Sequence, residues 1–290
     1  MNANDNKAAT SAAPPDVAVE AWSGKDKGDE NFPVGSWLIR AGLRRHVHAF
    51  YTFARNADDI ADSASLSPDQ KIERLNVMEE VLTGARAQGA PSAVRLRESL
   101  AESGVAAIHA RELLVAFRQD AVQNRYENWA GLMDYCRYSA APVGRYVLDL
   151  HGESRETWPA SDALCAALQV NNHIQDCGGD LRSLDRCYIP QDWLAQAGAS
   201  VDDVARPETV PALREVLDKM LAATQELNAA GALLPGQVKA RRLRVEVAII
   251  AALARRLTVR LEAGDPLAAR VKLTKTDFLF STLAALPRLA

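Results

Sequence analysis

Residues 50–62 are Phe-Tyr-Thr-Phe-Ala-Arg-Asn-Ala-Asp-Asp-Ile-Ala-Asp, an apolar repeat that ends in closely spaced aspartates. Five apolar positions recur at helical intervals and predict one buried helix face: Phe50, Phe53, Ala54, Ala57 and Ala61. Residues four apart lie on the same face of a helix, so Asp58 and Asp62 are side by side. Such a like-charge pair costs roughly 0.2–0.5 kcal/mol in an isolated helix, which indicates a cationic partner.

The same spacing occurs once more in the chain, at Asp176 and Asp180. Gln169 and Asn172 extend this second pair into a polar stripe on one helix face. A single pair of this kind is usually a solvated surface, but two copies on apolar helices favour a cation site. Mg²⁺ carrying a diphosphate fits, because Mg²⁺ accepts one or two carboxylates and fills its other positions with water and phosphate oxygens.

Three further segments accompany the acids. Arg55 precedes Asp58 by three positions, residues 135–144 are Tyr-Cys-Arg-Tyr-Ser-Ala-Ala-Pro-Val-Gly, and residues 185–190 are Asp-Arg-Cys-Tyr-Ile-Pro. Together, and in this order, the motifs resemble those of the squalene and phytoene synthase family from about Glu30 to the C-terminal region. The resemblance implies an all-α, single-domain helical bundle around a central apolar cavity. It also implies a prenyl diphosphate substrate and Mg²⁺ as cofactor, with Mn²⁺ as an alternative ion.

Within the family, residues 30–34, 57–63 and 172–177 resemble the branch of bacterial hopanoid biosynthesis that makes hydroxysqualene. That likeness implies conversion of presqualene diphosphate and water to hydroxysqualene and diphosphate, with water capturing the carbocation and no NADPH. Synthesis of presqualene diphosphate, squalene or phytoene stays open, as does, more distantly, a non-enzymatic lipid-binding protein. The chain departs from the family pattern at Gly179, where many relatives have Glu, and at Glu30, where some have Lys.

The resemblance assigns three overlapping sets of site residues. The catalytic residues would be Tyr138, Asp58, Asp62, Asp176 and Asp180. The metal ligands would be Asp58, Asp59, Asp62, Asn172, Asp176 and Asp180. The residues that bind substrate would be Phe32, Tyr51, Arg55, Gln169, Asn172, Arg186 and Tyr188. For the two arginines the alternative is an ion pair with a neighbouring aspartate, and for each tyrosine it is a core position with an ordinary hydroxyl partner.

Composition narrows the class of protein. The 290 residues carry a formal charge of −3 and are 48% hydrophobic, which suits a large core and gives no sign of a nucleic-acid partner. The four cysteines lack Cys-x-x-Cys spacing, so free thiols in a reducing cytoplasm are favoured over a zinc site. No dinucleotide-binding glycine motif is present in the sequence. We therefore expect a cytoplasmic enzyme that acts on a small molecule.

The chain ends are expected to differ from its centre. Residues 1–29 predict a disordered tail, and residues 30–290 an isoprenoid synthase domain. No apolar run approaches the roughly 20 residues that span a bilayer. Residues 278–287 follow Lys272 and Lys275 and predict a final helix docked on the core. The alternative is a segment that rests on the inner face of the membrane.

Helical periodicity covers most of the chain. The predicted helices are 35–63, 68–89, 91–106, 109–122, 128–151, 161–178, 208–231, 237–263 and 275–286. The glycine pair at 178–179 predicts a break, after which the chain to Pro190 would form a loop across the mouth of the site.

Overall fold

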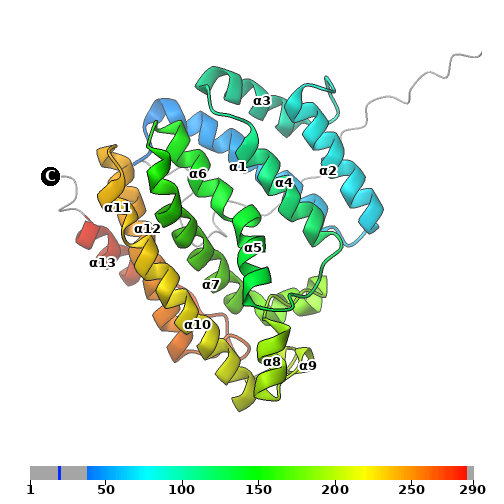
Figure 1. Ribbon diagram of the computed structural model, residues 1–290, viewed down its shortest axis with the longest axis vertical. Coiled ribbons are helices and arrows are strands. Elements are labelled where there is room, and N and C mark those ends of the chain that lie inside the picture. The colour runs from blue at the N-terminus through cyan, green and yellow to red at the C-terminus, as the bar shows by residue number, and fades with distance from the viewer. Residues whose placement is uncertain (1–18, 21–37, 286–290) are drawn as a thin grey trace, which may run out of the picture.

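The computed structural model describes residues 19–20 and 38–285, and its regular elements are helical throughout (Figure 1). In chain order they are α1 (Ala41–Asp62), α2 (Pro68–Thr83), α3 (Pro91–Ser103), α4 (Ile108–Asp120), α5 (Trp129–Ser139), α6 (Ala141–Leu150), the 3₁₀ turn η2 (Arg155–Thr157), α7 (Trp158–Leu184), α8 (Gln191–Ala197), α9 (Val201–Val204), α10 (Pro211–Gly231), α11 (Leu234–Gln237), α12 (Arg241–Ala263) and α13 (Lys275–Ala285). The predicted all-helical bundle is confirmed. Its central apolar cavity stays a prediction.

Two groups of helices build the core. Helices α1 to α4 and α6 enclose one apolar cluster, in which Phe50 of α1 stacks on Tyr146 of α6 with ring centroids 4.0 Å apart. Helix α7 runs through the other half, packed by α6, α10 and α12 (Figure 1). Phe53, Ala57 and Ala61 are fully buried, as the apolar stripe of the first motif predicts. The two acidic motifs therefore belong to different halves of the core.

Local sequence signals explain several helix ends. Ser67 and Gln70 form a reciprocal capping box at the start of α2, where Pro68 needs no hydrogen-bond partner for its nitrogen. Gly84 ends α2 and Gly104 ends α3, each with a left-handed backbone that favours glycine. The predicted start of a helix at Pro68 is confirmed, whereas the predicted helix 91–106 ends earlier, at Ser103.

Several predicted helices differ in extent from the observed ones, and the predicted helix 68–89 already ends at Thr83. The predicted helix 128–151 is two helices, because Pro142 in the first turn of α6 has no N–H to continue α5, and the backbone turns at Ala140 (φ −121°). The predicted break at 178–179 is absent: α7 continues through both glycines to Leu184. The short elements η2, α8, α9 and α11 were not predicted, since helices of one or two turns carry little periodicity.

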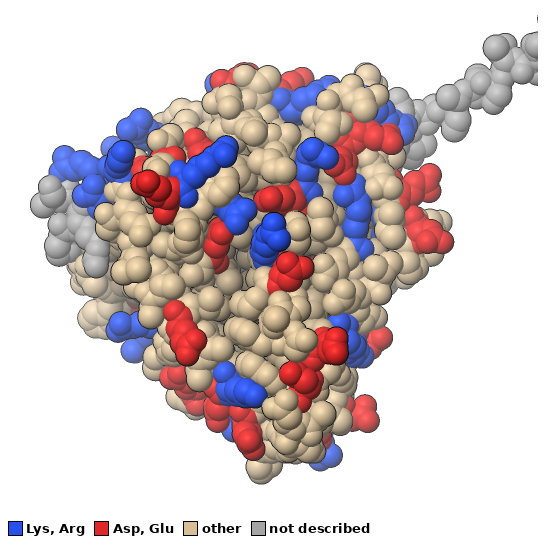
Figure 2. Space-filling model, in the orientation of Figure 1, with Lys and Arg blue, Asp and Glu red and all other residues tan. Residues whose placement is uncertain are grey.

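The C-terminal helix docks on the bundle, as predicted, with α13 lying along α12 at the edge of the molecule (Figure 1). Among the described residues, no helix is both long and apolar enough to cross a bilayer. On the face shown in Figure 2, basic and acidic side chains are interspersed, and no extended patch of one sign is visible there. The predicted tail, residues 1–29, lies almost entirely outside the described residues.

Candidate active site

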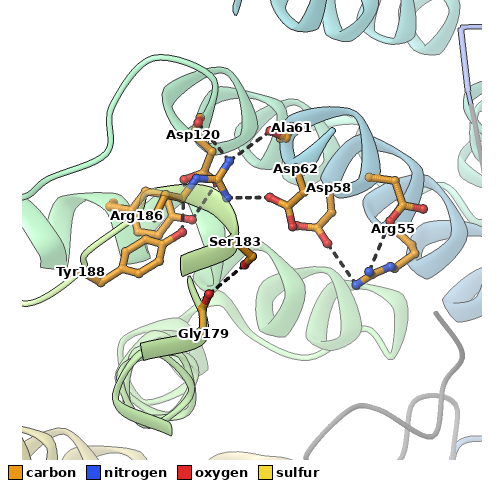
Figure 3. Close-up of polar contacts among 11 residues, drawn as sticks. Arg55, Asp58, Ala61, Asp62, Asp120, Gly179, Ser183, Arg186 and Tyr188 are labelled. Carbon is orange, nitrogen blue, oxygen red and sulfur yellow. Dashed lines mark hydrogen bonds and ion pairs between the residues drawn. The ribbon is translucent and has the colours of Figure 1, made fainter. Parts of the chain in front are cut away.

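The acids of the first motif lie at the C-terminal end of α1, where Arg55 contacts two of them. Its Nη1 atom lies 3.0 Å from Asp58 Oδ2, and its Nη2 atom lies 3.3 Å from Asp59 Oδ1 (Figure 3). The Asp59 side chain is nearly buried, whereas that of Asp58 is about one-third exposed. The ion pairs considered as the alternative for Arg55 are thus present. They supply a cation that relieves the repulsion between the acids.

The loop after α7 carries the second arginine. Asp185 ends the helix with a left-handed backbone (φ 53°) and turns the chain so that Arg186 points back toward α1 (Figure 3). A second segment holds this loop in place: Arg125 Nη2 lies 2.6 Å from Asp185 Oδ1, and the Cys187 amide donates to the Asn124 carbonyl at 2.9 Å. The loop therefore begins at 185, later than predicted, and it contacts the first acidic helix through Arg186. Its place across the mouth of the site stays a prediction.

Arg186 joins three elements through its guanidinium group. Nη1 lies 2.6 Å from Asp62 Oδ1, while Nη2 donates to the carbonyls of Ala61 at 3.1 Å and of Asp120 at 3.0 Å (Figure 3). The residue is only 5% exposed. Burial would lower the pKa of Arg186, but the negative charges of Asp120 and Asp62 and the Tyr188 hydroxyl raise it above its ordinary value. Arg186 is therefore a permanent cation beside the first motif.

A buried carboxylate, Asp120, lies behind Arg186. The hydroxyl of Tyr135 donates to its Oδ2 atom at 2.9 Å, and the hydroxyl of Tyr188 donates to Oδ1 at 3.5 Å. Burial raises the pKa of Asp120 to about 6, although Arg186 and the Tyr135 hydrogen bond act in the opposite direction. Tyr188, assigned to substrate, has the ordinary hydroxyl partner considered as its alternative.

His173 of α7 completes this aromatic layer. Its ring stacks on that of Tyr188 with centroids 3.6 Å apart and lies 6.0 Å from that of Tyr135. Burial, reinforced by the charge of Arg186, lowers the pKa of His173 to about 3. The imidazole is therefore neutral at physiological pH, and it adds packing and no charge to the region behind the first motif.

The second motif lies on α7 beneath the segment that connects α12 to α13. Arg270 of this segment pairs with Asp176, with Nε 2.9 Å from Oδ1 and Nη2 3.1 Å from Oδ2. Gln175 donates to the Val271 carbonyl at 2.5 Å. A Cβ atom at Gly178 would lie 2.9 Å from Leu267, whereas a Cβ at Gly179 would meet nothing within 4 Å. The connecting segment therefore rests directly on the second motif.

The other predicted residues lie on the elements expected of them. Gln169, Asn172, Asp176 and Asp180 are half-buried along one side of α7, between buried positions, as the polar stripe predicts. Tyr138 of α5 is also half-buried and packs at the edge of the core, with the guanidinium of Arg137 5.0 Å from its ring centroid. Tyr51 of α1 is half-buried as well. Phe32 lies outside the described residues.

Sequence reasoning missed three residues that organise the site: Asp120, Tyr135 and Arg270. Tyr135 was visible, because it opens the segment 135–144 three positions before Tyr138. Asp120 had no motif to mark it, although an aspartate at the end of an apolar helix pattern is unusual enough to be noticed. Arg270 lies in an irregular segment far along the chain from Asp176, and no local pattern connects the two.

The donor atoms present are suited to a hard divalent cation. Mg²⁺ prefers carboxylate and amide oxygens, which Asp58, Asp62, Asp176, Asp180 and Asn172 supply. In the part of the chain that the structure describes, however, no three His, Cys, Asp or Glu side chains are already gathered into a cluster that could hold a metal ion. Three of these carboxylates form ion pairs with arginines instead: Asp58, Asp62 and Asp176.

Comparisons with known proteins agree on one family. The model of the squalene/phytoene synthase family matches residues 25–277. The chain is 48% identical over 269 residues to the hydroxysqualene synthase of Rhodopseudomonas palustris, covering 93% of this chain and 92% of that protein. It is 47% identical over 259 residues to the hydroxysqualene synthase of Zymomonas mobilis, covering 89% and 87% of the two chains.

A solved structure supports the fold. The crystal structure of squalene synthase HpnC from Alicyclobacillus acidocaldarius superposes with a TM-score of 0.70 at 33% identity, covering 78% of this chain and 85% of that one.

Proposed function

Because this chain belongs to the squalene/phytoene synthase family, we propose that it is a hydroxysqualene synthase. In this reaction presqualene diphosphate loses diphosphate, and water captures the resulting carbocation to give hydroxysqualene. The observation that carries the proposal is the identity of 47–48% to hydroxysqualene synthases over about nine-tenths of the chain.

The arginines would bind the diphosphate directly, whereas the acids would bind it through the metal. Arg55 and Arg186 present planar, permanently charged groups that suit phosphate oxygens. Both now contact aspartates, so an incoming diphosphate would exchange one anionic partner of the arginine for another. Arg186 is anchored by two backbone carbonyls as well, and it can keep its position during that exchange.

The acids released by this exchange would hold the metal. Asp58, Asp59 and Asp62 from α1, and Asp176, Asp180 and Asn172 from α7, are the residues that we propose as ligands for Mg²⁺. The bound ion supplies Lewis-acid stabilisation of the departing diphosphate. A Cβ atom at Gly179 would meet nothing within 4 Å, so the absence of a side chain at this position is not required by close packing.

The remaining candidates would act on the organic part of the substrate. Tyr138, Tyr51 and Gln169 are half-buried, so their side chains combine an apolar body with a polar end. Tyr138 and Gln169 are the residues that we propose to orient the cation or a water molecule. For Tyr188 we propose a positioning role as well as the expected contact with substrate, since Asp120 and His173 contact its hydroxyl and its ring.

Analysis of the product tests the proposal. The purified full chain is incubated with Mg²⁺ and presqualene diphosphate in ¹⁸O-labelled water, with and without NADPH, and the extract is examined by mass spectrometry. We expect hydroxysqualene carrying one labelled oxygen, formed equally without NADPH. A hydrocarbon formed only with NADPH would identify squalene synthesis instead. A parallel incubation with farnesyl diphosphate that yields presqualene diphosphate would identify the preceding reaction.

A further inference from the structure

Helix α13 presents its apolar side to solvent. The residues that it buries are Asp277, Ser281 and Ala285, which are small or polar. Leu279, Phe280 and Leu283 point away from the bundle, and they are 55%, 68% and 51% exposed. A surface helix normally buries its apolar stripe and exposes its polar face, so α13 is inverted.

Specific contacts hold the helix in this orientation. Asp277 lies 2.8 Å from Arg256 Nε and 2.7 Å from Arg260 Nε, both on α12. The same carboxylate accepts hydrogen bonds from the amide and the hydroxyl of Thr274, each at 2.7 Å. These bonds fix the first turn of α13 on α12. The outward direction of the apolar residues is therefore built into the fold.

Basic residues surround the apolar stripe. Lys272, Lys275 and Arg255 are exposed around α13. Residues 255–285 contain six Lys and Arg against three Asp and Glu, although the whole chain carries a formal charge of −3. This segment is thus locally cationic. An apolar helix face bordered by basic side chains is the combination that binds anionic lipid surfaces.

A groove of about 500 Å³ lies along the inner edge of the stripe, between α12 and α13. Its wall combines small apolar side chains with one aromatic ring, that of Phe280, and with the charged side chains of Arg255, Arg256 and Asp277. The small apolar residues include Ala248, Ala251 and Ala252. Alanines leave room where larger residues would fill the space, and Arg255 provides a cation near the apolar surface. The groove continues the apolar surface of α13 into the protein.

We propose that the outward face of α13, with this groove, docks on an anionic lipid bilayer. Leu279, Phe280 and Leu283 would enter the boundary between headgroups and acyl chains, and Lys272, Lys275 and Arg255 would contact the lipid headgroups. The use of such a surface rests on the proposed function, because a substrate with a long hydrocarbon body and a hydrocarbon alcohol product both partition into bilayers. Binding itself requires no catalysis.

The docking face and the candidate active site are joined by the segment that precedes α13. Within eight residues of Lys275, Arg270 pairs with Asp176, Val271 accepts from Gln175, and Leu267 packs over Gly178. The segment that leads into α13 therefore connects the proposed docking face to the second acidic motif along the chain.

Flotation with vesicles tests the proposal without reference to activity. The full chain is mixed with vesicles of phosphatidylcholine alone or of phosphatidylcholine with an equal amount of phosphatidylglycerol, and the bound fraction is measured after flotation. We expect binding to the anionic vesicles that weakens as salt is raised, and at least about tenfold weaker binding to the neutral vesicles.

A matched pair of variants locates the binding surface. Leu279→Asn with Phe280→Asn and Leu283→Asn should lower the affinity for anionic vesicles by about tenfold or more. Val122→Asn is the control, because Val122 is 63% exposed and follows α4, on the other side of the molecule from α13 (Figure 1). It should bind like the wild type. Circular dichroism and thermal denaturation establish that both variants are folded.

Three results would overturn the inference. The first is that wild-type protein does not float with anionic vesicles. The second is that the triple variant floats as well as the wild type. The third is a wild-type dimer in solution that the triple variant converts to a monomer with vesicle binding unchanged, which would show that a second copy of the chain covers the stripe. None of these results bears on the product assay, so the two proposals fail separately.

Discussion

Three arginines neutralise carboxylates of the two acidic motifs. Arg55 contacts Asp58 and Asp59 at the end of α1, Arg186 contacts Asp62, and Arg270 contacts Asp176. Two of these arginines come from segments distant in sequence. The carboxylates can therefore be packed closely in the absence of metal, and the cost of their mutual repulsion is offset within the fold.

Removal of single acids should abolish catalysis and preserve the fold. We expect Asp58→Asn, Asp62→Asn, Asp176→Asn and Asp180→Asn each to lower turnover by about two orders of magnitude or more, because each change removes a metal ligand. Asparagine keeps the volume of the side chain, so the helical content should not change. Steady-state kinetics and circular dichroism provide the measurement.

The control for this series is Asp134→Asn, since Asp134 lies on α5 with its side chain 67% exposed. It should retain wild-type turnover. Full activity in Asp176→Asn would contradict the two-sided site and leave the metal on α1 alone.

The two tyrosines of segment 135–144 should separate activity from stability. Tyr135→Phe removes a hydrogen bond to the buried carboxylate of Asp120 and should lower the free energy of unfolding by about 1–3 kcal/mol. Tyr138→Phe changes a half-buried hydroxyl and should lower kcat at least about tenfold with little loss of stability. Urea denaturation and kinetics on both variants measure the difference. Equal effects of both substitutions on kcat would refute this division of roles.

Asp120 should make stability depend on pH in an unusual direction. Because burial raises its pKa to about 6 in the folded chain, against about 3.9 when unfolded, the folded state binds more protons between these values. Its contribution to the free energy of unfolding therefore falls as pH rises through this window, by on the order of 3 kcal/mol in all. His173, with a pKa lowered to about 3, contributes with the opposite sign between about pH 3 and 6.5.

Asp120→Asn isolates the first effect. The free energy of unfolding of the variant minus that of the wild type should rise between about pH 4.5 and pH 7. The Asp134→Asn variant, measured by the same urea titrations, should give a difference that does not change with pH. A flat difference for Asp120→Asn as well would mean that Asp120 ionises normally.

At the scale of elements, α7 shows what local sequence could and could not predict. The glycine pair at 178–179 indicated a break, because glycine lowers helix propensity. The helix continues because Leu267 and Val204 cover Gly178 and tertiary packing outweighs that propensity. The apolar stripe of α1 was predictable because its period is local. The contact of Arg270 with Asp176 was not, since it depends on how α12 returns to α7.

Two glycines should respond oppositely to alanine. At Gly231, where α10 ends, a Cβ atom would lie 2.9 Å from Leu164 Cβ and 3.0 Å from the Leu164 backbone, so Gly231→Ala should separate α10 from α7. We expect it to destabilise the protein by about 1–3 kcal/mol. Gly179→Ala meets open space and should stabilise α7 by about 0.5–1 kcal/mol. Thermal or urea denaturation of both variants measures this. Destabilisation by Gly179→Ala would argue that this part of α7 is not helical.

At the scale of the whole molecule, the contacts between the two halves of the core were less predictable from sequence than the helices within each half. Sequence motifs indicated that both acidic helices serve one substrate, and this stays a prediction. The motif around Arg186 indicated that this residue belongs to the site, but its hydrogen-bond partners could not be predicted. Two of them are the backbone carbonyls of Ala61 and Asp120, and every residue type has such a carbonyl. The outward direction of the apolar face of α13 could not be predicted from the sequence either. Periodicity gives the apolar side of a helix but not the direction in which that side points.

Metal and diphosphate should stabilise the protein only together. Mg²⁺ alone competes with arginines that already neutralise the acids, so it should raise Tm by no more than about 1 °C, whereas Mg²⁺ with inorganic diphosphate should raise it by several degrees. Differential scanning fluorimetry of the full chain measures both. Asp176→Asn is the matched variant and should lose most of the joint shift. A full shift with Mg²⁺ alone would contradict the exchange of partners.

The ion pair between Arg186 and Asp62 also bears on protein synthesis. The two residues are 124 positions apart, so a ribosome must complete α7 and expose the loop beyond it before the pair can form. Until then Asp62 of a nascent chain lacks the arginine with which it pairs, and contacts so distant in sequence form late. A half-made chain is therefore unable to generate a reactive carbocation. The reaction therefore requires the second half of the polypeptide to have been synthesised.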